Sequence, residues 1–228
     1  MIITDTSDIT VENNMAQYGG GVILEDSNIT ISGDITVRNN TAQRDGGGIS
    51  SYFNNIYVGD GIPIQSSKIH ISGNMTVENN MAQQDGGGIS LRNININVSG
   101  DITVKSNLAQ IGGGMYLVQT IFNTSGDFTV TSNTAQGSGG GMYSWGSRID
   151  CSGNMTVRDN MAQDDGGGIY MVGTYLILAS INKFTTNSAR KGGGISPFSL
   201  FSLLLPEAFN PFMNSSHVSI PSLWAEPE

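Results

Sequence analysis

The chain repeats one unit of about 27 residues almost from end to end, and this periodicity constrains its fold more than any other feature. The clearest copy is GNMTVRDNMAQDDGGGIY, at residues 153–170. Glycine triplets mark seven copies and start at Gly19, Gly46, Gly86, Gly112, Gly139, Gly166 and Gly192. Their spacings are 27, 40, 26, 27, 27 and 26 residues, so one copy carries an insertion.

A second marker repeats in step with the glycines. It is the asparagine of an N-x-A element, found at Asn14, Asn40, Asn80, Asn107, Asn133, Asn160 and Asn187. Because two markers keep the same period, the pattern is a structural repeat and not a bias of composition. If the copies stack, these asparagines form an internal amide ladder in which each side chain bonds to the neighbouring copies.

Within each copy, apolar residues alternate with Thr, Ser, Asn and charged residues. In one copy Ile69, Ile71, Met75 and Val77 lie two or four positions apart. A period of two predicts short strands with one buried face, and the Ser-Gly and Asn-rich segments between them predict turns. Roughly three short strands in each 27-residue unit indicate one coil of a parallel β-solenoid of about seven coils. One predicted inward column is Ile31, Ile71, Val98, Thr124, Cys151 and Leu178.

The repeat also resembles a known family. The pair F-x-x-N and G-G-A-I, used repeatedly, is typical of the chlamydial polymorphic outer membrane protein repeat. Here Phe184-Thr-Thr-Asn187 precedes Gly192-Gly-Gly-Ile195, and the other six copies read V-x-x-N followed by a glycine triplet. The resemblance covers residues 1 to about 196. It implies an all-β, single-stranded, right-handed parallel β-helix, displayed at a surface and used in adhesion, and it carries over no catalytic residue.

The pattern divides the chain into two parts. Residues 1–196 form the repeat domain, with an insertion at about 52–64. Insertions in solenoids project as loops and often carry binding residues, so Tyr52, Phe53 and Tyr57 are candidates; folding of these rings onto the next coil is the alternative. Residues 197–228 lack the repeat and are expected to cap the last coil or to be disordered.

An aromatic column is the second binding candidate. Tyr116, Tyr143 and Tyr170 lie 27 residues apart, each directly after an inward residue, so they point outward and stack at the coil spacing. The stack is either a structural ladder or a platform for sugar rings, with Trp145 beside it.

Acidic residues also align, and calcium is the one cofactor to consider. Asp101 and Asp127 occupy one turn column, and Asp45 and Asp85 occupy another. Neighbouring carboxylates on stacked coils either extend into solvent, which is the default expectation, or hold a hard cation between them. We expect no other metal and no other cofactor.

Charge and composition limit the partners. The net charge is −9 with only 10 Lys and Arg, which argues against nucleic acid and anionic membranes. The single cysteine, Cys151, excludes an internal disulfide and is expected to be a buried thiol. The chain has no transmembrane segment, and we expect a monomer or end-to-end association. It opens in mid-repeat without a signal peptide, which suggests a fragment of a longer extracellular or cell-surface protein.

The sequence therefore favours a structural or adhesive surface protein whose ligand is a glycan or a protein. The alternative is a polysaccharide-degrading β-helix enzyme, a lyase or a glycoside hydrolase. Such an enzyme needs paired acids, or carboxylates with calcium and a basic residue. No catalytic constellation stands out in the sequence, so we do not expect an enzyme.

Overall fold

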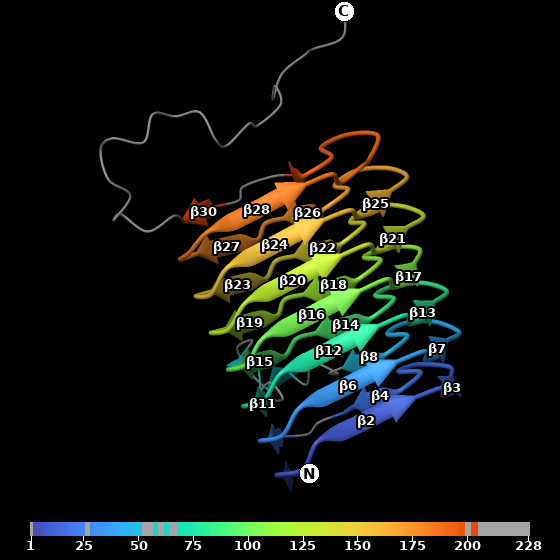
Figure 1. The fold of residues 1–228 in the computed structure, drawn as a ribbon, viewed down its shortest axis with the longest axis vertical. Helices are drawn as coiled ribbons and strands as arrows, with labels where there is room; N and C mark the ends of the chain where they lie inside the picture. Colours follow the sequence, from blue (N-terminus) through green and yellow to red (C-terminus); the bar gives the residue numbers. More distant parts are fainter. Residues whose placement is uncertain are drawn as a thin grey trace, which may run out of the picture.

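The computed structural model describes residues 2–25, 28–51, 57–58, 62–63, 68–198 and 202–204. Within these residues the chain is all-β, and parallel strands from successive coils lie side by side in continuous sheets (Figure 1). The predicted parallel β-solenoid of about seven coils is thereby confirmed. The expectation of roughly three strands per coil is wrong, because a complete coil contributes a strand to each of four sheets.

The first and second sheets form two sides of the solenoid. The first contains β1 (Ile2–Asp5), β5 (Asn28–Ile31), β11 (Lys68–Ile71), β15 (Asn95–Val98), β19 (Ile121–Thr124), β23 (Arg148–Cys151), β27 (Tyr175–Leu178) and β30 (Ser202–Leu204). The second contains β2 (Ile9–Glu12), β6 (Ile35–Arg38), β12 (Met75–Glu78), β16 (Ile102–Lys105), β20 (Phe128–Thr131), β24 (Met155–Arg158) and β28 (Asn182–Thr185).

The third and fourth sheets complete each coil. The third is built from two-residue strands, β3 (Met15–Ala16), β7 (Thr41–Ala42), β13 (Met81–Ala82), β17 (Leu108–Ala109), β21 (Thr134–Ala135) and β25 (Met161–Ala162). The fourth contains β4 (Val22–Leu24), β8 (Ile49–Ser51), β14 (Ile89–Arg92), β18 (Met115–Val118), β22 (Met142–Trp145), β26 (Ile169–Val172) and β29 (Ile195–Phe198). Coil one is β1–β4, coil two β5–β8, coil three β11–β14, coil four β15–β18, coil five β19–β22, coil six β23–β26 and coil seven β27–β29.

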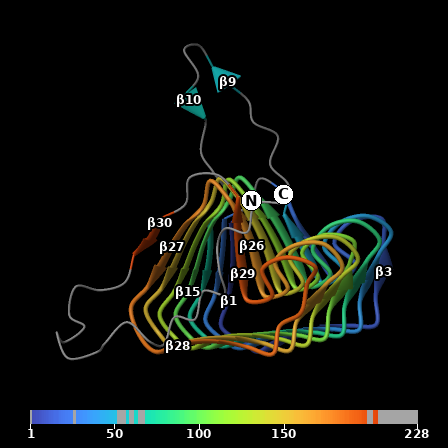
Figure 2. The same cartoon turned by 90° about the horizontal axis from the view of Figure 1, so that it is seen from above.

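Seen along its axis, the solenoid has a main body and a side lobe that carries the third sheet (Figure 2). The described part of the insertion is an antiparallel pair, β9 (Tyr57–Val58) with β10 (Ile62–Pro63), which lies away from the body (Figure 2). The insertion leaves the stacking undisturbed, since Ile31 pairs with Ile71, and Ile49 with Ile89, across it. Pairing continues past residue 196, because β30 pairs with β27.

The core fills the main body with columns of like side chains. The predicted inward column pairs in register from Ile31 through Ile71, Val98, Thr124 and Cys151 to Leu178, and all six residues are buried. In coil five two phenylalanines fill the centre: the ring centroids of Phe122 and Phe128 lie 5.4 Å apart. Each coil therefore buries its apolar side chains against its neighbours, as expected for a solenoid.

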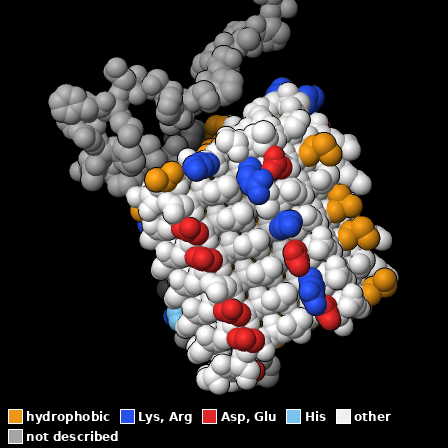
Figure 3. Space-filling model, in the orientation of Figure 1, with side chains coloured by type: hydrophobic (Ala, Val, Ile, Leu, Met, Phe, Trp, Pro, Cys, Tyr) orange, Lys and Arg blue, Asp and Glu red, His pale blue; other side chains and the backbone are white. Residues whose placement is uncertain are grey.

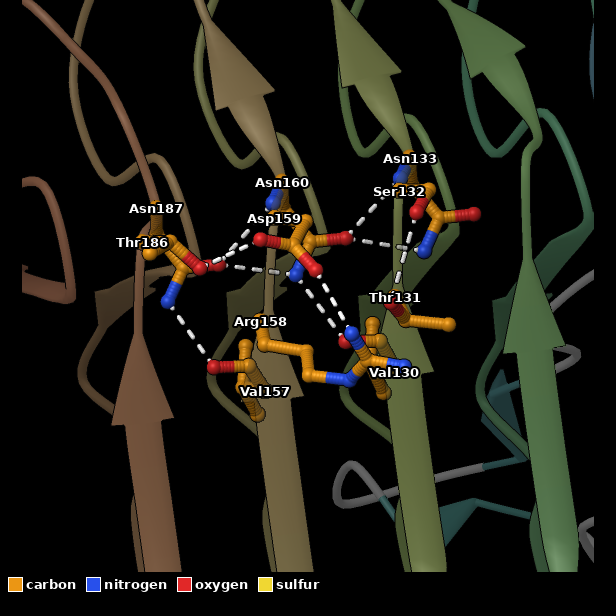
Figure 4. A network of polar contacts seen from close by, with 10 residues as sticks. All are labelled: Val130, Thr131, Ser132, Asn133, Val157, Arg158, Asp159, Asn160, Thr186 and Asn187. Carbon is orange, nitrogen blue, oxygen red and sulfur yellow. Dashed lines mark hydrogen bonds and ion pairs between the residues drawn. The ribbon is translucent and has the colours of Figure 1, made fainter.

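The seven asparagines of the N-x-A elements form one continuous ladder at the junction of the second and third sheets. Asn133 is typical: its Nδ2 donates to Oδ1 of Asn160 at 3.0 Å and to the carbonyl oxygen of Val104 at 3.0 Å. Its backbone N–H donates to the same Oδ1, also at 3.0 Å. Figure 4 shows these bonds continuing to Asn187. The ladder satisfies amides that would otherwise be buried without partners.

In coils one to six the glycine triplet connects the third-sheet strand to the fourth-sheet strand, and each glycine meets a different constraint. In the triplet from Gly86 to Gly88, the first residue has φ +65°, a conformation that favours glycine. A Cβ on Gly87 would lie 2.3 Å from the carbonyl oxygen of Gly113 and 2.5 Å from that of Leu108. A Cβ on Gly88 would lie 3.0 Å from the side-chain amide of Asn107. The triplet thus lets backbone pack directly on backbone and on the asparagine ladder.

Candidate functional site

The three tyrosines lie in one outward column of the fourth sheet. Tyr116 pairs with Tyr143, and Tyr143 with Tyr170, between buried columns on either side. The rings are stacked: their centroids are 5.2 Å apart in both pairs, with interplanar angles of 14° and 28°. All three are half-buried. Small residues flank the three tyrosines in this column, since Ser90 precedes Tyr116 and Ser196 follows Tyr170.

This stacking decides what the column can offer a ligand. The facing surfaces of the rings cover one another, so Tyr143 has no free ring face. A sugar that stacks on an aromatic residue needs an open face, whereas ring edges and hydroxyl groups suit mixed polar and apolar contacts. The ladder therefore presents a row of ring edges at the coil spacing.

A charged cluster closes one end of the tyrosine ladder. Arg92, on β14, places its guanidinium 4.7 Å from the centroid of the Tyr116 ring. The same guanidinium lies 2.8 Å from Oδ2 of Asp85 and 3.3 Å from Oδ2 of Asp45. A cation between two carboxylates and an aromatic face is held by both charge and the ring quadrupole. Arg92 also keeps the two acids from repelling each other at close range.

The electrostatics of this cluster follow from its partial burial. Burial raises the pKa of Asp85, and the neighbouring charge of Asp45 raises it further, while Arg92 opposes both effects. The phenol of Tyr116 also has a raised pKa, chiefly because of burial and then because of the Asp85 charge. At the other end of the ladder, burial and the nearby Asp165 raise the pKa of Tyr170. The tyrosines of the ladder therefore stay neutral phenols, with the carboxylate of Asp85 near one end and that of Asp165 near the other.

The sequence analysis did not single out Arg92. Its role could have been found from the register, because Ser90 occupies the tyrosine column and Arg92 lies two residues further along the same strand. Trp145 lies two residues after Tyr143 on β22, and its side chain is exposed. The ladder, Arg92 and Trp145 together form an aromatic strip on the fourth sheet.

The turn acids have a structural role that the sequence did not suggest. Oδ1 of Asp101 accepts the backbone N–H of Asp127 at 2.8 Å, and Oδ1 of Asp127 accepts that of Asn154 at 2.9 Å. The same bond recurs along the column at Asp8, Asp34, Asn74 and Asn154. Each side chain therefore satisfies a turn N–H of the next coil. A calcium ion at Asp101 and Asp127, or at Asp45 and Asp85, stays a prediction.

Other candidates have simpler positions. Tyr52 and Phe53 lie outside the described residues, and Tyr57 belongs to β9 although its side chain is not described. Cys151 is buried. The pKa of its thiol is raised to about 11, chiefly by burial and then by the nearby charge of Asp127. Among the described residues, no group of three or more His, Cys, Asp or Glu is placed to hold a metal ion.

Fold and surface together define a class: a repeat-built parallel β-solenoid whose coils are joined by side-chain ladders. Comparison with protein families identifies the repeat itself. Residues 34–52, from the start of β6 past the end of β8, match the Chlamydia polymorphic membrane protein repeat. The chain thus carries a repeat of the polymorphic membrane protein type, found in a family of surface-associated proteins. No curated protein and no solved structure shows a significant match.

The described part of the chain contains no helix long and apolar enough to cross a membrane.

Proposed function

We propose that this solenoid is displayed at a cell surface or secreted, and that it binds a partner through the aromatic strip of its fourth sheet. The observation that carries the proposal is the outward stack of Tyr116, Tyr143 and Tyr170, with Arg92 on one end and exposed Trp145 beside it. Tyr, Trp and Arg are the residue types that dominate the energetic centres of protein interfaces.

Rigidity supports the same conclusion. Tyr143 is held between two rings, Tyr116 between Tyr143 and Arg92, and Tyr170 against Tyr143. Arg92 is held by two carboxylates, so little side-chain freedom remains to be lost on binding. Ordering a flexible side chain at an interface costs roughly 0.5–1.5 kcal/mol, and a pre-ordered strip avoids much of that cost. The strip thus offers a flat, pre-organised surface.

A protein ligand fits this strip better than a glycan does. Sugar rings stack on open aromatic faces, and the stacking of the tyrosines leaves only the outer faces of the end rings, one of which Arg92 covers. Ring edges, hydroxyl groups and an indole suit the mixed surface of a protein. An adhesive role, in which the solenoid holds a host or matrix protein, follows from this surface and from the surface-associated repeat family.

The test is binding of the purified chain to arrays of extracellular-matrix proteins and of glycans, followed by affinity measurement on each hit. Tyr143→Ala is expected to weaken binding by roughly thirtyfold or more, the loss of an interface hot spot of about 2 kcal/mol. Tyr175→Ala is the matched control, because Tyr175 is an exposed tyrosine on the first sheet. Equal binding by the two variants would remove the aromatic strip from the proposal. Hits on glycans alone would favour a glycan ligand.

One observation favours a polysaccharide-degrading enzyme as the second candidate. Asp45, Asp85 and Arg92 meet at one edge of the fourth sheet, and the Asp85 pKa is raised, as a general acid requires. Release of reducing or unsaturated ends from acidic polysaccharides, with and without calcium, would support this candidate. Loss of that release in Asp85→Asn would assign it to the cluster.

A further inference from the structure

A line of exposed apolar side chains runs along the outer edge of the third sheet. The methionine stripe consists of one residue from each coil, paired in register: Met15, Thr41, Met81, Leu108, Thr134, Met161 and Ser188. Its four large members are 74%, 42%, 37% and 49% exposed. Figure 3 shows hydrophobic side chains aligned along this edge, at the right of the view. The aromatic strip lies on a different sheet, so the stripe is independent of the proposed function.

The positions two residues before and two residues after the members of the stripe carry little charge. The residues two positions before its members in coils one to six are Asn13, Asn39, Asn79, Ser106, Ser132 and Asp159, and those two positions after are all glutamine. The single charge at these positions, Asp159, is paired with Arg158 at 2.8 Å. One position further from the stripe the charges alternate in sign, in the order Glu12, Arg38, Glu78, Lys105. The chain carries a net charge of −9, so two copies meet with least repulsion along a neutral surface of this kind.

The order of large and small residues in the stripe is self-complementary. From coil one to coil seven it reads large, small, large, large, small, large, small. If a second copy lies antiparallel with Leu108 on the two-fold axis, Leu108 meets its own copy, and each of the six remaining positions pairs a large residue with a small one. Met81 then faces Thr134 of the second copy, Met161 faces Thr41, and Met15 faces Ser188. A parallel arrangement would pair like with like and leave gaps at the threonines.

Charge at the two ends selects the same arrangement. Coil one carries Asp5, Asp8 and Glu12, and the first basic residue of the chain is Arg38. Coil seven carries Lys183, Arg190 and Lys191, with no acidic residue between Asp165 and Glu207. Arg190 lies 3.9 Å from Asp164 and 3.8 Å from Asp165 of coil six, which leaves the two lysines as the unpaired basic residues of this group within the described part of the chain. An antiparallel pair places the acidic coil of each copy beside the basic coil of the other, which favours this orientation over the parallel one.

We propose that the methionine stripe is a self-association surface, and that two copies of this chain pack antiparallel along it about a two-fold axis at Leu108. The interface is isologous, as in most homodimers. Seven coils give a ridge about 34 Å long and one side chain wide. Such a ridge buries less than the roughly 1,200 Å² of stable complexes, so the dimer is weak and forms at high protein concentration.

Sedimentation velocity over a wide concentration range tests this directly. The mass of the unmodified chain is expected to double as concentration rises, and Leu108→Lys is expected to stay monomeric because two ammonium groups would meet on the axis. Ile121→Lys is the matched control, since Ile121 is exposed on the first sheet and lies outside the stripe. A chain that stays monomeric throughout, or loses the dimer equally in both variants, would overturn the proposal.

Exchanging the side chains at positions 81 and 134 tests the register of the dimer. Met81→Thr alone leaves a gap opposite Thr134, and Thr134→Met alone crowds Met81, so each is expected to weaken the dimer at least severalfold. The double variant exchanges large for small and is expected to restore the affinity. Additive losses would exclude the Leu108-centred register.

A lipid surface is the competing occupant. Binding to vesicles of neutral phosphatidylcholine that Leu108→Lys abolishes, in a chain that never dimerises, would assign the stripe to lipid and contradict self-association.

Discussion

Asn107 shows how much of the fold depends on single residues. Its side chain takes part in four buried hydrogen bonds: two accepted from Asn80, one donated to Asn133 and one donated to the carbonyl of Val77. Leaving a buried donor or acceptor unpaired costs about 1–3 kcal/mol. We therefore expect Asn107→Ala to lower the free energy of unfolding by about 3 kcal/mol or more in urea melts. Gln110→Ala, on the surface of the same coil, is the control and should change little.

The Asp85 cluster makes a second prediction for single residues. Asp85 has a raised pKa in the folded chain, so the folded state holds its proton more tightly than the unfolded state does. Its contribution to stability is therefore greatest below the ordinary value of 3.8 and is lost as pH rises through the raised value. Arg92 lowers this pKa, so Arg92→Gln should raise it further. Carboxyl titration by NMR measures both values, and an unchanged Asp85 pKa in the variant would show that Arg92 does not act on it.

At the residue scale, periodicity identified which side chains share a column but not what the columns do. The asparagine ladder and the inward column of Ile31 could be predicted because each recurs at a fixed step and each has one physical use. The turn acids were expected to be solvated or to hold calcium, and their bonds to backbone N–H groups depend on turn geometry that no spacing encodes. The closed faces of the tyrosines likewise depend on ring angles.

Among the elements, the glycine triplet sets how closely successive coils approach each other beside the third sheet. Gly87 has backbone atoms within 2.6 Å of where a Cβ would lie, so Gly87→Ala must force two coils apart. Gly173 has a positive φ of 53° but nothing within 4 Å of its Cβ position. We expect Gly87→Ala to abolish or severely reduce folding, and Gly173→Ala to cost only about 1 kcal/mol, the ordinary penalty of that conformation. Circular dichroism and urea melts on both variants measure the difference.

The strands show where sequence patterns lose resolution. Alternation predicted the strands of the first, second and fourth sheets, because most of them have apolar residues two apart. The third sheet was missed as a separate element since its strands have only two residues, such as Leu108–Ala109, and no alternation can appear in two positions.

The whole molecule behaves as a stack in which each coil is stabilised mainly by its neighbours. Phe128 lies in coil five and is fully buried, whereas Phe184 lies in coil seven and is only partly buried. Phe128→Ala is expected to cost about 3–5 kcal/mol and to lower amide protection in the coils on both sides. Phe184→Ala should lower protection in coil seven alone. Hydrogen exchange resolved by coil separates these outcomes, and uniform loss in both variants would contradict nearest-neighbour stacking.

The 13-residue difference between the 40-residue step and its 27-residue neighbours is accommodated without loss of register. That could be predicted, because the markers resume in phase after it. The positions of Tyr52 and Phe53 are not set by the repeat, and they lie outside the described residues.

The proposed binding through the aromatic strip requires that the solenoid be displayed at the cell surface or secreted. The most direct test is binding of an antibody against the repeats to intact, unpermeabilised cells of the native source and to their culture medium. We predict that intact cells or medium carry the epitope, and that mild protease treatment of the cells removes it from the cell surface. An epitope that appears only after the cells are permeabilised, with none in the medium, would contradict a surface role.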